Sequence, residues 1–150
     1  MSLQRLIGIT ATVLTLAVGS MASAEVILNV PKIVGKSKAE VEKEIGSANS
    51  CVQTKYGEQC FFEKADTEVV FIDGRADWIT VNKMGTLPYS KESLAALGLP
   101  VAEPVFNSAS IMRWDNLAGI LEVSLLSQGK SVYYAYIKVK TTVGSPKLEH

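Results

Sequence analysis

The stretch Glu68-Val-Val-Phe-Ile-Asp-Gly-Arg-Ala-Asp-Trp-Ile-Thr-Val81 contains the strongest structural signal in this sequence. Two runs that are rich in β-branched and aromatic residues, 68–72 and 75–81, flank the dipeptide Asp73-Gly74. Asp-Gly suits the two positive φ values of a type I′ turn, whose twist matches that of the flanking strands. The stretch therefore predicts a tight antiparallel hairpin.

Side-chain alternation gives the second strand of this hairpin two different faces. Ile79 and Val81 point to one side, which we expect to be the core. Trp78, Thr80 and Asn82 point to the other side, where a tryptophan has polar neighbours.

A helix is predicted upstream of the hairpin, at about residues 37–45. Ser37-Lys-Ala-Glu40 is a capping box, in which each side chain bonds a backbone N–H that the first turn leaves free. Gly46 supplies the end of the helix. Before it, residues 25–30 (EVILNV) are expected to form a short strand that Pro31 closes.

The two cysteines, Cys51 and Cys60, lie between this helix and the hairpin. The intervening residues are typical of two short strands around a turn near 55–57, which would place the cysteines opposite one another. We therefore predict one disulfide, worth about 2–3 kcal/mol by chain entropy. The alternative, a redox-active pair, normally needs the closer Cys-x-x-Cys spacing.

Downstream, the same order of elements is repeated. Ser90 and Gly98 bracket a second predicted helix at 90–97. Strands are predicted at 111–114, 119–127 and 131–141, with turns near 115–116 and 128–130.

This order predicts an α+β fold. We expect two similar units, residues 31–84 and 88–141, each a helix followed by an antiparallel meander. The two units pack as one domain over residues 25–147, with the helices on one face of the sheet.

Both ends of the chain are interpreted as processing features. Residues 1–24 have the order of a secretory signal: a basic start, an apolar run from Leu6 to Met21, and Ala22-Ser-Ala24 before the expected cleavage. The alternative is a membrane-spanning helix, for which this apolar run is short. Residues 148–150 (Leu-Glu-His) resemble the start of an expression tag. The mature protein is thus expected to be periplasmic or secreted, without a membrane anchor.

The run from Gly35 to Gly46, followed by the strands and the Phe71-Ile-Asp-Gly-Arg75 hairpin, resembles the helix-and-meander unit of the SmpA/OmlA-type (BamE-like) outer-membrane lipoproteins. The doubled unit is similar to that of β-lactamase inhibitor protein. This resemblance implies a non-catalytic protein that binds other proteins through its sheet. Glu25, which follows the expected cleavage point, differs from the acylated cysteine of the lipoproteins.

Several classes of chemistry are disfavoured. The only histidine is His150, in the tag remnant, so no Ser-His-Asp triad, Cys-His pair or imidazole zinc site is expected in the native chain. We predict no catalytic residue, no metal site and no cofactor. The 15 basic and 15 acidic residues are interspersed, which argues against a nucleic-acid partner.

One sheet face is the candidate binding site. Alternation along residues 132–140 sets Tyr133, Ala135, Ile137 and Val139 on the apolar side and leaves Tyr134, Tyr136 and Lys138 on the other. The candidate face consists of Trp78, Thr80, Asn82, Tyr134, Tyr136 and Lys138. Tryptophan and tyrosine are enriched at binding hot spots, although they also form second-layer core.

The interpretation is a protein-binding or inhibitor-like module whose partner is another envelope or extracellular protein. Two alternatives remain open. One is a small carboxylate-dependent hydrolase, because two converging acids suffice for glycoside hydrolysis, and the candidates include Asp66, Glu68, Asp73, Asp77 and Glu122. The other is an envelope-assembly structural module. Oligomeric state is not predicted.

Overall fold

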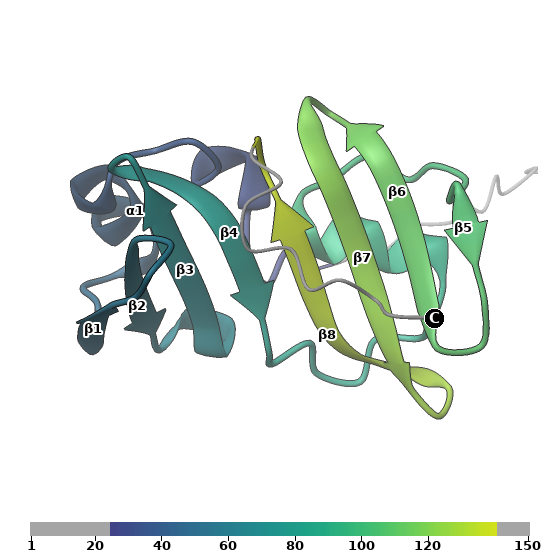
Figure 1. Cartoon of the computed structure of the whole chain (residues 1–150). Coiled ribbons are helices and arrows are strands. Elements are labelled where there is room, and N and C mark those ends of the chain that lie inside the picture. Colours follow the sequence, from purple (N-terminus) through teal and green to yellow (C-terminus); the bar gives the residue numbers. More distant parts are fainter. Residues whose placement is uncertain (1–24, 141–150) are drawn as a thin grey trace, which may run out of the picture.

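A computed structural model describes residues 25–140 of the chain. One antiparallel sheet of eight strands, in the order β1-β2-β3-β4-β8-β7-β6-β5, forms its centre (Figure 1). The strands are β1 (Ser50–Gln53), β2 (Glu58–Phe62), β3 (Thr67–Ile72), β4 (Arg75–Val81), β5 (Phe106–Asn107), β6 (Ile111–Leu117), β7 (Ile120–Gln128) and β8 (Ser131–Lys138). The predicted signal peptide, its cleavage site and the tag remnant lie outside the described residues.

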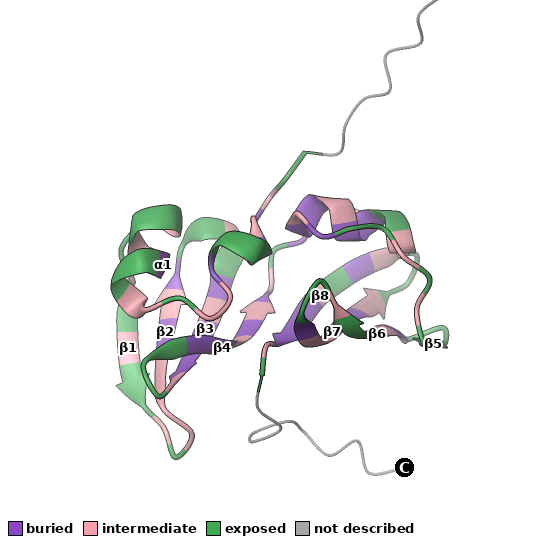
Figure 2. Cartoon of the chain, turned by 90° about the horizontal axis from the view of Figure 1, so that it is seen from above, coloured by how far each residue is buried: buried purple, intermediate pink, exposed green. Residues whose placement is uncertain are grey.

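The helical segments are short. They are the α-helix α1 (Lys38–Ile45) and the 3-10 segments η1 (Val30–Lys32), η2 (Lys64–Asp66) and η3 (Lys91–Leu97). Seen along the sheet, α1 and η3 lie on the same side of the strands (Figure 2). Neither of these two segments lies on the opposite side of the sheet, which we call the helix-free face. No helix within residues 25–140 is long and apolar enough to span a bilayer.

The prediction of an α+β fold made of two helix-plus-meander units is wrong. The fold is β-rich, because β4 pairs with β8 and joins all the strands into one continuous sheet. Residues 31–84 and 88–141 therefore do not form two helix-plus-meander units. The second predicted helix is the 3-10 segment η3, and Ser90 makes no side-chain cap there. A pairing between strands so far apart in sequence leaves no local signal.

The core lies between the sheet and the segments η1, α1 and η3. One ladder of buried residues crosses six strands in register, and Ile79 pairs with Val69 on one side and with Ile137 on the other. The ladder contains Cys60, Val69, Ile79, Ile137, Val123 and Trp114. Trp114 is 2% exposed, and its indole N–H donates to the carbonyl of Ala102 at 2.9 Å.

Two local predictions also need correction. Residues 25–30 form no strand, because the Ile27 N–H donates to the carbonyl of Ala96 and η1 begins at Val30. Pro31 thus lies in the first turn of η1, where its missing N–H costs nothing. The tight turn of the β6–β7 hairpin lies at 118–119, after the predicted 115–116, since Leu117 pairs with Ile120.

The disulfide prediction is confirmed. Cys51 and Cys60 are directly opposite in the β1–β2 ladder and are bonded to each other. The bridge ties the edge strand β1 to the sheet, which fits an oxidising, exported environment.

The predicted capping box at α1 is also confirmed. The Ser37 hydroxyl accepts from the Glu40 N–H at 3.3 Å, and the Glu40 carboxylate accepts from the Ser37 N–H at 2.8 Å. This backbone hydrogen bond, with help from the Ser37 hydroxyl, lowers the pKa of Glu40 below its ordinary value. Hydrogen bonds to the ionised form of a carboxyl favour that form.

A pH dependence of stability follows from Glu40. Because its pKa is lower in the folded than in the unfolded chain, its contribution is present above the unfolded pKa and is lost as pH falls through the folded pKa. Glu40→Gln keeps a capping-box side chain but removes the charge. Between about pH 6 and about pH 3, we expect the melting temperature of the variant to fall less than that of the wild type. Thermal unfolding followed by circular dichroism checks this, and identical pH profiles for both proteins would contradict it.

Candidate functional site

The predicted face residues lie on the helix-free face of the sheet. In the β4–β8 ladder Trp78 pairs with Lys138 and Thr80 pairs with Tyr136. The rings of Trp78 and Tyr136 meet edge to face, with centroids 5.7 Å apart. Tyr134 and Asn82 lie further along these strands, at a separate hollow.

Two of the six candidates are buried, so the six do not form one exposed patch. Tyr136 is 9% exposed and Lys138 is 0% exposed, whereas Trp78, Thr80, Asn82 and Tyr134 are partly exposed. Tyr136 and Lys138 lie on this face beside Thr80 and Trp78, their cross-strand partners, but both are buried there. Alternation placed Lys138 on the candidate face but did not show that its side chain is buried, and a buried ammonium needs a charged partner.

That partner is Asp77. Its carboxylate lies 3.0 Å from the Lys138 ammonium and also accepts the backbone N–H of Lys140 at 3.0 Å. A β-bulge explains the position of Asp77: Val70 pairs with Trp78 and Phe71 with Ala76, so Asp77 is the extra residue. A bulge re-aims side chains in this way. The Lys138 ammonium lies 5.2 Å from the centre of the Trp78 ring, so the ion pair also anchors the tryptophan.

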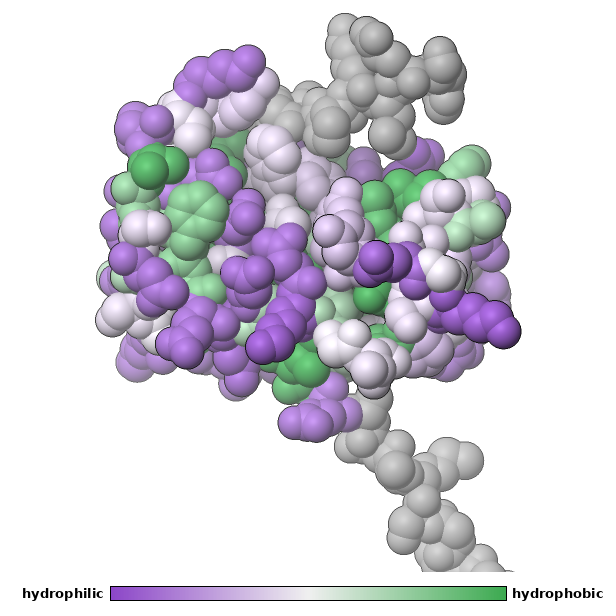
Figure 3. All heavy atoms as spheres, turned by 90° about the horizontal axis from the view of Figure 1, so that it is seen from below, coloured by the Kyte–Doolittle hydropathy of each residue, from purple (hydrophilic) through white to green (hydrophobic). Residues whose placement is uncertain are grey.

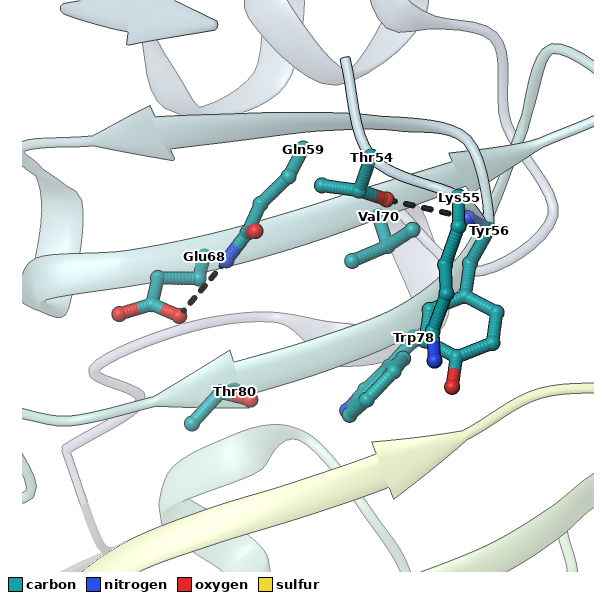
Figure 4. Close-up of a pocket in the computed structure, with 8 residues that line it drawn as sticks. All are labelled: Thr54, Lys55, Tyr56, Gln59, Glu68, Val70, Trp78 and Thr80. Atoms are coloured by element: carbon teal, nitrogen blue, oxygen red, sulfur yellow. Dashed lines mark hydrogen bonds between the residues drawn. The ribbon is translucent and has the colours of Figure 1, made fainter. Parts of the chain in front are cut away.

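A groove opens on this face beside Trp78, and we call it the aromatic groove (Figure 4). It has a volume of about 270 Å³ and is lined by Thr54, Lys55, Tyr56, Gln59, Glu68, Val70, Trp78 and Thr80. Figure 4 shows the rings of Tyr56 and Trp78 at one end of the groove and the Glu68 carboxylate at the other. The rings approach to 6.1 Å between centroids.

The β1–β2 turn holds Tyr56 in place. The Thr54 hydroxyl accepts from the Tyr56 N–H at 3.2 Å and donates to the Gly57 carbonyl at 2.8 Å. Gly57 lies so close to the Phe71 carbonyl that the turn is fixed over the end of β3. Sequence analysis missed Tyr56, because a turn residue has no alternation to assign its direction.

A second hollow, which we call the acidic hollow, adjoins the aromatic groove. It has a volume of about 490 Å³, and its lining residues are Asp66, Glu68, Asn82, Tyr133 and Tyr134. Glu68 belongs to both hollows. Amide groups of Gln59 and Asn82 donate to its two carboxylate oxygens at 3.2 and 3.3 Å. These neutral donors orient the carboxylate without cancelling its charge.

Tyr133 departs from the predicted apolar side. It is 56% exposed, whereas its neighbours Val132 and Ala135 are buried. Leu126 pairs with Tyr134 and Ser127 with Val132, so Tyr133 is the extra residue of a second bulge. Its ring packs edge to face on Tyr134, at 5.4 Å between centroids. Alternation alone does not predict such a residue.

The described residues hold one group with metal-ligand atoms close together, Cys51, Glu58 and Cys60. The two sulfurs are bonded to each other, so they are unavailable as thiolate ligands.

The surface seen from below mixes apolar and hydrophilic residues and has no extended apolar area (Figure 3).

Comparisons with protein-family models, with curated proteins and with solved structures find no match for this chain. The resemblance to the lipoproteins and to the inhibitor therefore stays a prediction.

Proposed function

We propose that this chain is a non-catalytic binding module that recognises another protein through the helix-free face of its sheet. The observation that carries the proposal is the aromatic groove, in which Tyr56 and Trp78 stand partly exposed over a rigid base. Aromatic side chains of this kind contribute a disproportionate share of binding energy at interfaces.

The residues around Trp78 and Tyr56 also support this function, because they are held in place before any partner binds. Trp78 packs on Tyr136 and the buried Lys138, and the disulfide holds the strands beneath Tyr56 together. A surface that is ordered before binding loses little conformational entropy when a partner docks. The partner is another envelope or extracellular protein, and the site of action is the periplasm or the cell exterior.

A carboxylate-dependent hydrolase has one observation in its favour, since Asp66 and Glu68 line the same hollow. The general acid of such an enzyme is normally kept protonated by an apolar, buried setting. Asp66 is exposed, and Glu68 is partly exposed and surrounded by the amide groups of Gln59 and Asn82, so neither has such a setting. These features favour binding over catalysis.

Affinity capture from an envelope extract of the source organism tests the proposal. The wild-type chain and a Tyr56→Ala/Trp78→Ala variant serve as baits, and recovered proteins are quantified by mass spectrometry. We expect at least one protein to be recovered about tenfold less by the variant, because a loss of about 1.4 kcal/mol lowers affinity tenfold. Tyr136 is left unchanged, since it is buried and its removal would disturb the sheet.

Phe106→Ala is the matched control, because Phe106 is an exposed aromatic residue on β5 at the far end of the sheet. It should recover the same proteins as the wild type. Equal recovery by the double variant, or no specific protein with the wild type, would refute the proposed function.

A further inference from the structure

We infer that the aromatic groove and the acidic hollow together bind an extended partner segment that presents an arginine, with its guanidinium between Trp78 and Glu68. This inference rests on the proposed function and specifies the chemistry of the partner. It is carried by the charge of the groove, by the spacing of its residues, and by the geometry of arginine.

The charge at the centre of the two hollows is negative. Glu68 lies between them, and Asp66 lines the acidic hollow with it. Within residues 25–140, neither carboxylate forms an ion pair with a lysine or arginine. Three other carboxylates of the sheet do: Glu58 pairs with Lys38, Asp115 with Arg113 and Asp77 with Lys138. Two amides thus orient the Glu68 carboxylate, but no cation among the described residues pairs with it. A complementary partner would supply that positive charge.

The spacing of the groove fits one long basic side chain. Glu68 pairs with Thr80 and Val70 pairs with Trp78, so Glu68 and Trp78 are diagonal neighbours across β3 and β4. Such neighbours stand roughly 7–8 Å apart, within reach of one long side chain. The aliphatic stem then covers Val70, and the head group meets the carboxylate.

Arginine suits this arrangement better than lysine or a neutral sugar. A guanidinium stacks on aromatic rings and donates two parallel hydrogen bonds to a carboxylate, which an ammonium cannot do. A sugar would stack on the rings but would leave the charge of Glu68 uncompensated. The exposed Lys55 already places its ammonium 4.8 Å from the centre of the Tyr56 ring, at the rim of the groove. A partner arginine would displace it.

Titration by two-dimensional NMR tests the inference. The probes are the peptide Ac-Ser-Thr-Arg-Thr-Ser-NH2 and its citrulline counterpart, which keeps the planar head but lacks the charge. The readout is the indole N–H signal of Trp78. The buried Trp114 indole serves as an internal control that should not shift. We expect the arginine peptide to bind Trp78 at least about fivefold more tightly than the citrulline peptide.

Glu68→Gln should abolish this preference, because it replaces the charge with an isosteric amide. Glu92→Gln, an exposed change on η3 at the helix-bearing face, should leave it intact. Maltose serves as a neutral sugar probe. Equal binding of the two peptides, no binding of either, or a shift of the Trp78 signal by maltose but by neither peptide would overturn the inference. If a captured protein depends on Tyr56 and Trp78 but is unaffected by Glu68→Gln, the inference fails while the proposed function stands.

Discussion

Asp77→Ala is expected to destabilise the protein by about 3–5 kcal/mol, because it takes the carboxylate away from a buried ammonium. Asp77 is 5% exposed and Lys138 is 0% exposed, so the ion pair is shielded from water. The substitution also removes the acceptor of the Lys140 N–H. Urea unfolding followed by tryptophan fluorescence measures the effect, and Trp78 reports directly on it.

A double substitution separates the charge from the packing. Asp77→Leu combined with Lys138→Met replaces the ion pair by apolar side chains, which is often neutral or stabilising in protein interiors. We expect the double variant to regain most of the stability that Asp77→Ala loses, apart from about 1 kcal/mol for the backbone hydrogen bond. Glu103→Ala is the control, since it breaks the exposed pair with Lys91 and should cost far less. A double variant as unstable as Asp77→Ala would contradict this account.

Gly57→Ala is expected to cost at least about 3 kcal/mol, because the new methyl group has no room. A Cβ at this position would lie 2.1 Å from the Phe71 carbonyl oxygen and 3.1 Å from its carbon. Both are backbone atoms, so the β1–β2 turn would have to move away from β3. Equilibrium unfolding in urea gives the free-energy change. Because Tyr56 precedes Gly57, we also expect binding through the aromatic groove to weaken.

Gly74→Ala is the matched control for this steric effect. Gly74 has a positive φ of 73°, but a Cβ there would meet no atom within 4 Å. It should therefore cost only the strain of a left-handed residue, about 1–2 kcal/mol. If both substitutions cost the same, the close approach of Gly57 to Phe71 contributes nothing to stability.

The local elements of the fold were predictable from sequence. The β3–β4 hairpin, the capping box of α1 and the cross-strand disulfide each depend on residues that are close together in the chain. Alternation also placed Ile79 and Val81 in the core. The joining of β4 to β8 was not predictable, because backbone hydrogen bonds between distant strands have no signature in either strand alone.

The candidate site was predictable only in part, and the two bulges explain why. Each bulge adds one residue to a strand, so period-two reasoning assigns the wrong direction to Asp77 and Tyr133. The same reasoning identified the face of Trp78 but gave no indication that Lys138, its cross-strand partner, is buried. Glu68 was considered only as one of several acids that could converge, although the hairpin register places it opposite Thr80 on the candidate face.

The pairing of β4 with β8 also has a kinetic consequence. Strands β1 to β4 and strands β5 to β8 each contact mainly their neighbours in sequence, so each meander can form through short loops. The β4–β8 ladder closes a far longer loop, and it brings Lys138 and Tyr136 next to Trp78. The slowest step of folding is therefore expected to be the docking of the two meanders. Until that step is complete, both unpaired edges are exposed to other chains, and refolding yield should fall as protein concentration rises.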